Sequence, residues 1–313
     1  MQTTLPEWQK KDAVALTPAL QPPISISTWK LVVTLFKLRI VTLLLMAAYG
    51  GAALGVIAGG EASLGSLLLL TITGILSAGG ASGINQYLER DRDARMTRTA
   101  RRPLPSGYLA HPRRVLWIGL GMVAMAVALA APFNLALSFW LLCGALIYVA
   151  VYTIWLKPRT AWNIVIGGAA GSCAVISGGA AVGAWSAPTV WLLALLIFVW
   201  TPVHFWSLAL AYREDYARGD YPMLPVQVSP QTAARWTGLH TYLTVGTAVF
   251  LGVWPQVDWL YLIPIGLAAL LFIRRTQTLL NQPEKQPALA LFHFSNLYLS
   301  LALLMVILSA FWR

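Results

Sequence analysis

The acidic side chains of this chain are few and clustered. The sequence has 313 residues and only eleven Asp and Glu residues. Six of them form two short clusters, which are Glu89, Asp91 and Asp93, then Glu214, Asp215 and Asp220. Loop carboxylates that balance nearby arginines would also produce such clusters. Two features favour a functional site instead: both clusters are predicted to lie on the same side of a membrane, and one of them has helical register.

Asn85, Glu89 and Asp93 are spaced four residues apart. On an α-helix this spacing predicts a column of oxygen ligands that climbs roughly 12 Å along one face. Asp91 points away from that column and is predicted to face solvent or a cation. Oxygen ligands without nearby His or Cys suit magnesium, which commonly joins carboxylates to a substrate diphosphate. Neighbouring arginines would neutralise the remaining negative charge.

The elements that carry these residues are predicted to be transmembrane helices. Hydrophobic residues make up 58% of the chain, charged residues 11%, and the mean hydropathy is +0.67. Soluble domains carry about 25% charged residues. The composition therefore excludes a disordered chain and argues against a soluble enzyme. Cys143 and Cys173 both lie in apolar runs, which implies no disulfide or zinc framework.

We predict an all-α polytopic membrane protein, because many apolar runs reach the roughly 20 residues that cross a bilayer. Nine spans are predicted, with bounds 31–57, 64–88, 115–131, 135–156, 162–183, 188–212, 233–253, 257–273 and 289–311. The glycine-rich residues 167–179 are interpreted as close helix packing and not as a phosphate loop. Residues 1–30 are predicted to be a cytoplasmic tail and residues 31–313 a single transmembrane domain.

Basic residues predict the orientation of the spans. The connections after spans two, four, six and eight carry nearly all Lys and Arg residues, and the other connections carry none. The positive-inside rule then places the N-terminus and both acidic clusters in the cytoplasm and the C-terminus outside. The net charge of +11 is attributed to basic cytoplasmic loops and anionic lipid, with no nucleic-acid partner expected.

Several motifs resemble the UbiA superfamily of intramembrane prenyltransferases. Its first signature is similar to residues 85–93, NQYLERDRD, with Met96, Arg98-Thr99 and the RPLPSG run 102–107 after them. Further similar blocks are 37–41, 152–157 and 160–171. The run WTPVHFW at 200–206, with Asp215-Tyr216 and the PMLP run 222–225, resembles the haem-farnesylating branch of this superfamily. The resemblance covers roughly residues 30–310.

The resemblance implies a fold and a reaction. The fold is a bundle of nine helices around a cavity open to lipid, in the cell (inner) membrane. The reaction moves the farnesyl group of farnesyl diphosphate to a vinyl group of haem b, adds water, and gives haem o and diphosphate. Mg²⁺ is the implied cofactor, haem b is a substrate, and a haem a synthase or a terminal-oxidase assembly is the implied protein partner. The alternative is another aromatic acceptor, such as a quinone precursor.

The resemblance also implies roles for individual residues. The metal ligands with catalytic roles are Asn85, Glu89, Asp93 and Asp215. The diphosphate contacts are Arg39, Arg95, Arg98, Arg102 and Lys157. The presence of each of these cations is explained equally well by the positive-inside rule, which enriches cytoplasmic loops in Lys and Arg. Tyr152, one turn from Tyr148, would offer an aromatic face to the allylic cation. His204 would contact haem, although a lone His in an apolar helix is usually an interhelical hydrogen-bonding residue.

Three positions depart from the family pattern. Leu38 replaces a proline at the start of the first span, and residues 172–175 replace a paired proline, which puts a kink in the fifth span in doubt. Asp215 has Glu214 and Asp220 as neighbours at an unusual spacing. A secondary transporter is the rival class, but transporters bind near the midplane of the membrane and often show paired repeats. The two acidic clusters lie at the ends of spans, and nine spans cannot be divided into equal halves. Both features argue against a transporter.

Overall fold

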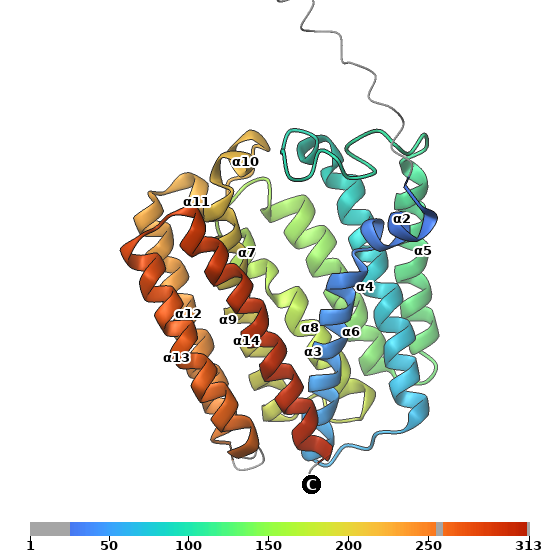
Figure 1. The fold of residues 1–313 in the computed structure, drawn as a ribbon. Helices are drawn as coiled ribbons and strands as arrows, with labels where there is room; N and C mark the ends of the chain where they lie inside the picture. The colour runs from blue at the N-terminus through green and yellow to red at the C-terminus, as the bar shows by residue number, and fades with distance from the viewer. Residues whose placement is uncertain (1–25, 255–258, 312–313) are drawn as a thin grey trace, which may run out of the picture.

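The computed structural model describes residues 26–254 and 259–311, and in these ranges the chain is helical without strands. Figure 1 shows the long helices side by side in one bundle. The helices in chain order are α2 Thr28–Leu35, α3 Leu38–Ile57, α4 Leu64–Asp93, α5 Arg113–Ala130, α6 Leu135–Leu146, the π-helix η1 Ile147–Leu156, α7 Asn163–Gly167, α8 Ala169–Ala181, α9 Pro188–Ala211, α10 Arg213–Arg218, α11 Leu224–Gln227, α12 Pro230–Gly252, α13 Trp259–Asn281 and α14 Lys285–Phe311.

Eight of the described helical segments are long and apolar enough to cross a membrane. Large apolar side chains such as Leu267, Leu270 and Leu297 remain more than half exposed around the bundle, where lipid can cover them. The all-α multi-pass prediction is therefore confirmed. The count of nine is not, because the predicted span 233–253 forms α12, a helix of 23 residues outside those eight.

α12 carries a row of buried threonines. Thr237, Thr241 and Thr244 are fully buried, and each hydroxyl donates to a carbonyl four residues earlier in the same helix. Such bonds satisfy a hydroxyl that has no water to bind. These three hydroxyls are therefore satisfied inside the bundle, while Leu239, Leu243 and Phe250 of the same helix are exposed.

The first predicted span begins too early, because the chain turns sharply at Lys37. This residue has φ 48° and ψ 47°, the left-handed conformation that non-glycine residues seldom adopt. The buried Gln86 of α4 donates from Nε2 to the carbonyls of Thr34 and Leu35, at 2.7 and 2.6 Å, and so fixes the end of α2. Of the predicted tail, residues 1–25 lie outside the described residues, and residues 28–30 belong to α2.

The fourth predicted span is not one α-helix, since its second half is the π-helix η1. The N–H of Lys157 donates to the carbonyl of Tyr152, five residues earlier, at 2.8 Å. The Thr153 hydroxyl donates to the carbonyl of Tyr148, also five residues earlier, at 2.7 Å. π-helical turns are rare and frequently occur at functional sites, and apolar periodicity gives no signal for them.

The glycine-rich stretch of the fifth span packs closely, as predicted. A Cβ at Gly178 of α8 would lie 1.7 Å from the Ala48 carbonyl oxygen of α3, so only glycine fits there. At the other end of the stretch the helix is interrupted at Gly168, between α7 and α8. Further contacts join α3 to α14 and α9 to both α12 and α14, so helices distant in sequence close the bundle.

The polar segments gather at one end of the bundle. In Figure 1 the connection between α4 and α5 lies at the same end as α2, α10 and α11. The last residues of α14 lie at the opposite end. Both acidic clusters therefore lie at one edge of the apolar bundle.

Candidate active site

The predicted column exists on α4. Its three residues are almost completely buried: the solvent-exposed fraction is 1% for Asn85, 7% for Glu89 and 4% for Asp93. Asp91, by contrast, keeps 77% of its side chain exposed and pairs with the neighbouring Arg90 at 3.4 Å. The predicted separation of Asp91 from the column is confirmed, and it follows from the helical register.

Glu89 forms an ion pair with Lys157, which directly follows η1. The ammonium nitrogen lies 2.5 Å from Glu89 Oε1, and both side chains are nearly buried. The same nitrogen lies 5.4 Å from the ring centre of Tyr152 and 4.5 Å from that of Tyr221. An ammonium group over aromatic faces is stabilised by the ring quadrupole. A carboxylate and two aromatic rings thus surround this cation.

Asp93 is paired in a similar way with Arg102 of the connection between α4 and α5. Arg102 Nη1 lies 2.8 Å from Asp93 Oδ2. The Thr99 hydroxyl donates to the Asp93 carbonyl at 2.7 Å. The connection therefore folds back over the end of α4, and its arginine reaches the outermost member of the column.

Asn85 holds the deepest position of the column. Its Oδ1 accepts from Lys37 Nζ at 2.7 Å, and its Nδ2 donates to the Thr153 hydroxyl of η1 at 3.0 Å. Lys37 also donates to the Tyr148 hydroxyl at 3.2 Å. The rings of Tyr148 and Tyr152 stack at 5.9 Å, with 11° between their planes. Aromatic faces, an amide and a cation therefore meet at this point.

Lys37 is the main site residue that the sequence reasoning missed. Headgroup contact and a role in the site were equally compatible with its position at the edge of a span. The block 37–41 contained a signal, but only the left-handed turn at Lys37 brings its ammonium group to Asn85.

Asp215 joins the second acidic cluster to the first through backbone donors. Its Oδ1 accepts from the N–H of Thr97 at 2.9 Å and from Arg218 at 2.6 Å. Its Oδ2 accepts from the N–H of Arg98 at 3.0 Å. Burial raises the pKa of Asp215, but these hydrogen bonds outweigh it and lower the pKa from 3.8 to about 2. The carboxylate thus anchors α10 to the connection that follows α4.

The two neighbours of Asp215 lie outside the column. Glu214 is exposed. Asp220 is exposed, has a left-handed φ of 54°, and its carboxylate lies 3.6 Å from Arg92. Arg92 also donates to the Asp220 carbonyl at 2.8 Å. These contacts tie the two clusters together at their rim.

The predicted diphosphate contacts do not all reach the column. Arg102 and Lys157 reach the column, whereas Arg39 and Arg95 are exposed. In the part of the chain that the structure describes, neither exposed side chain forms a hydrogen bond or an ion pair. Arg98 lies between these extremes, since its guanidinium group lies 5.9 Å from the ring of Tyr212 and 5.8 Å from that of Tyr216.

His204 lies on α9 but faces another direction. Its ring stacks on Trp200 at 4.7 Å and on Phe292 of α14 at 4.4 Å, and its Nδ1 lies 3.1 Å from the Ser295 hydroxyl. Trp206 packs with Tyr216 and Tyr221 beside the site. Residues two positions apart on an α-helix point about 200° apart, so His204 and Trp206 face opposite sides of α9. His204 therefore points towards α14 and not towards the column.

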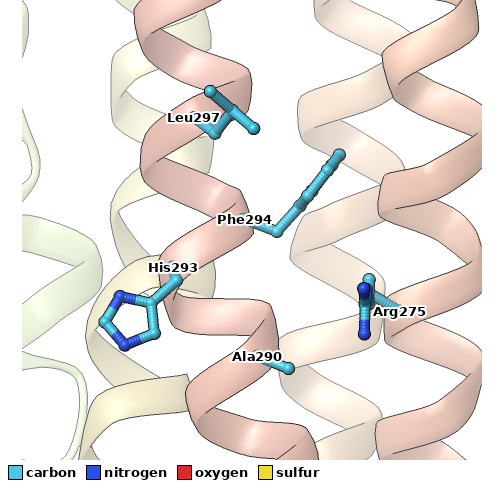
Figure 2. A pocket seen from close by; sticks show the side chains of 5 residues that line it. All are labelled: Arg275, Ala290, His293, Phe294 and Leu297. Atoms are coloured by element: carbon cyan, nitrogen blue, oxygen red, sulfur yellow. The ribbon is translucent and has the colours of Figure 1, made fainter.

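A separate groove lies between α13 and α14. It encloses about 310 Å³ and is lined by Arg275, Ala290, His293, Phe294 and Leu297. Figure 2 shows Phe294 pointing into this space and His293 pointing to the other side of its helix. No predicted site residue lines the groove, and none of its residues belongs to α4, η1 or α10.

The donor chemistry of the column fits magnesium, although the residues form no complete metal cage. Among residues 26–254 and 259–311, no three His, Cys, Asp or Glu side chains are grouped to hold a metal ion. Magnesium usually needs only one or two carboxylates, keeps several waters and binds substrate phosphates. Two carboxylates and an amide oxygen on one face meet that need. The buried Tyr221 hydroxyl, which has no partner in the described structure, adds an oxygen nearby.

Comparison with known proteins identifies the class. The model of the UbiA prenyltransferase family matches residues 43–298, and the chain belongs to this family. It is an enzyme of the prenyltransferase class, in a multi-pass membrane fold. A relative from Saccharolobus islandicus (strain L.S.2.15 / Lassen #1), named Protoheme IX farnesyltransferase, is 40% identical over 272 residues, which are 87% of this chain and 94% of the relative.

Two solved structures share the fold. A structure of digeranylgeranylglyceryl phosphate synthase superposes with a TM-score of 0.73 at 19% identity, over 92% of this chain and all of the other. A UbiA homolog from Archaeoglobus fulgidus bound to GPP and Mg²⁺ superposes with a TM-score of 0.59 at 18% identity, over 88% of this chain and 99% of the other.

The anchoring role of Asp215 can be tested by Asp215→Asn. We expect faster hydrogen exchange at the Thr97 and Arg98 amides and a loss of about 2 kcal/mol of stability, because hydrogen bonds to a charged group are lost. The folded pKa lies below the unfolded one, so this stabilisation is present above about pH 4 and declines as the pH falls towards 2. The difference from wild type should shrink over that range. Asp91→Asn, at an exposed acid, is the control, and equal effects of both changes would reject the anchor.

Proposed function

We propose that this protein transfers the farnesyl group of farnesyl diphosphate to a vinyl group of haem b, giving haem o. The carbon–oxygen bond to diphosphate breaks, the farnesyl carbon bonds to the vinyl group, and water supplies the hydroxyl group and releases a proton. The observation that carries the proposal is the buried column of Asn85, Glu89 and Asp93 with its cations. The 40% identity to a relative named Protoheme IX farnesyltransferase supports the choice of donor and acceptor.

Departure of the diphosphate is the step that the column would serve. Asn85, Glu89 and Asp93 would hold magnesium, with Asp215 as the further predicted ligand at the rim. Magnesium, when bound, neutralises charge that develops on the leaving oxygens. Lys157 and Arg102 would donate to the diphosphate oxygens, because fixed cations in a dry site stabilise developing charge strongly. Arg39, Arg95 and Arg98 lie at the same end and are proposed as outer contacts of the diphosphate.

The allylic cation needs a surface that stabilises it without trapping it. The stacked rings of Tyr148 and Tyr152 lie next to Lys37 and Lys157. Aromatic faces attract cations electrostatically, and an apolar pocket keeps water away until the new carbon–carbon bond has formed. We propose that the farnesyl carbon lies against Tyr152 during the transfer.

The reaction can be measured directly with purified protein in lipid. Haem b and farnesyl diphosphate with Mg²⁺ should give a haem whose mass has increased by a farnesyl group and a hydroxyl group. A chelator should abolish the product, and Mg²⁺ should restore it. 4-Hydroxybenzoate should give no prenylated product. Prenylation of 4-hydroxybenzoate without any change in haem would replace this proposal with the quinone-precursor alternative.

We also propose that the site faces the cytoplasm, with the N-terminus inside and the C-terminus outside. The arginine-rich connections support this orientation. Cysteines introduced at the exposed positions Ala62 and Ser186 should react with an impermeant thiol reagent from outside intact cells. Cysteines at the exposed positions Ser106 and Gln286 should react only after permeabilisation. The reverse pattern would invert the orientation.

His204 remains a proposed acceptor contact, in competition with an interhelical role. His204→Ala should raise the KM for haem about tenfold, or about 1.4 kcal/mol, and leave the KM for farnesyl diphosphate unchanged. Ser295→Ala removes the hydrogen-bond partner of His204 Nδ1 but keeps the His204 ring, so it is the matched control. If both variants lose similar stability and keep wild-type haem dependence, then His204 serves packing between α9 and α14.

A further inference from the structure

The site contains its own counter-ions. Lys157 lies 2.5 Å from Glu89, Arg102 lies 2.8 Å from Asp93, and Lys37 lies 2.7 Å from the Asn85 amide oxygen. The three oxygen-bearing side chains of the column are therefore each bound by a cation from a different segment. These are the oxygens that a metal ion would need, and the cations are those that a diphosphate would need.

We propose that divalent metal and diphosphate bind only as a coupled pair, by exchanging these internal partners. The carboxylates would pass from Lys157 and Arg102 to the metal, and the released cations would pass to the phosphate oxygens. The inference rests on the proposed diphosphate chemistry, but it makes no assumption about haem. It assigns Lys157, Arg102 and Lys37 a second role, as the resting counter-ions of the column.

Binding of the metal alone is unfavourable for two reasons. The three partners of the column, Lys37, Arg102 and Lys157, are cations, whereas the column has only two carboxylates. An added divalent ion would therefore increase an existing excess of positive charge. In addition, a metal that takes Glu89 leaves the Lys157 ammonium group, whose side chain is 12% exposed, without its anion. Burying an unpaired charge is costly. The rings of Tyr152 and Tyr221 can only partly replace the carboxylate.

Binding of diphosphate alone meets the converse problem. If Lys157 and Arg102 turn to phosphate oxygens, Glu89 and Asp93 are left buried and unpaired, at 7% and 4% exposure. When both ligands arrive, each carboxylate and each cation regains an opposite charge. Because every ion pair broken is replaced, the two binding events stabilise each other, and this coupling is reciprocal.

The test uses thermal unfolding and titration calorimetry of the full chain in detergent, with Mg²⁺ and inorganic diphosphate as probes. Ligands that bind the folded state raise the melting temperature. In wild type, the increase with both probes should exceed the sum of the separate increases. The association of Mg²⁺ with diphosphate in solution is measured without protein and subtracted. The remaining affinity of the protein for Mg²⁺ should rise about tenfold or more when diphosphate is saturating, within the usual range of coupling between sites. Simple additivity would overturn the proposal.

Lys157→Ala identifies the exchanging residue. With Glu89 left unpaired, the variant should be less stable than wild type without ligands, and Mg²⁺ alone should restore its stability. Its affinity for Mg²⁺ alone should exceed that of wild type by about tenfold, and its coupling to diphosphate should fall. Arg101→Ala removes an exposed arginine of the same connection that lies outside the site and should change neither quantity. Wild-type coupling in Lys157→Ala would reject the exchange.

A second variant covers the case in which Lys157→Ala does not fold. The Arg102 side chain is 30% exposed, so Arg102→Ala should fold. Because this change frees Asp93, the affinity for Mg²⁺ alone should rise and the coupling to diphosphate should fall, both by less than in Lys157→Ala. The result can also be separated from the proposed reaction. Coupled binding without haem farnesylation would retain this inference and reject the function, and farnesylation with additive binding would do the reverse.

Discussion

The ion pair between Glu89 and Lys157 is the interaction on which the site depends. Both side chains are nearly buried at the edge of an apolar bundle, where neither charge is stable alone. Removal of one partner from such a pair costs about 3–5 kcal/mol. The pair therefore requires α4 and η1 to remain in contact, and it requires that anything binding Glu89 provides a new anion for Lys157. Structure and chemistry are thus constrained by the same contact.

Two backbone irregularities supply the cations. A π-helix precedes Lys157, and its wider turn is stabilised where Thr153 donates to the Tyr148 carbonyl. A left-handed residue, which costs roughly 1–3 kcal/mol in local strain, brings Lys37 to Asn85. Gln86 supports that turn by closing the end of α2. Regular α-helices through both places would have directed these ammonium groups elsewhere.

The sequence predicted the features that depend on local periodicity and composition. The column on α4, the outward direction of Asp91 and the multi-pass helical class all follow from helical spacing and apolar length. The features that it missed depend on partners distant in sequence. The turn at Lys37 needs Gln86, which lies 49 residues later, and the role of Asp215 becomes visible only when Thr97 and Arg98 present their N–H groups. The count of nine spans is not confirmed, because α12 has the length of a span but is not among the eight helices that are apolar enough to cross a membrane.

The arrangement of α9 separates two kinds of chemistry along one helix. Trp206 belongs to the aromatic cluster that includes Tyr216 and Tyr221, next to Lys157. His204 turns to the opposite face and is held between Trp200 and Phe292. A ligand at the column and a ligand at His204 would therefore lie on different sides of α9. If His204 contacts the acceptor, then haem must approach from the α14 side, and its vinyl group must reach past α9 towards the stacked tyrosines. A purely structural His204 imposes no such route, which is why its haem dependence distinguishes the two roles.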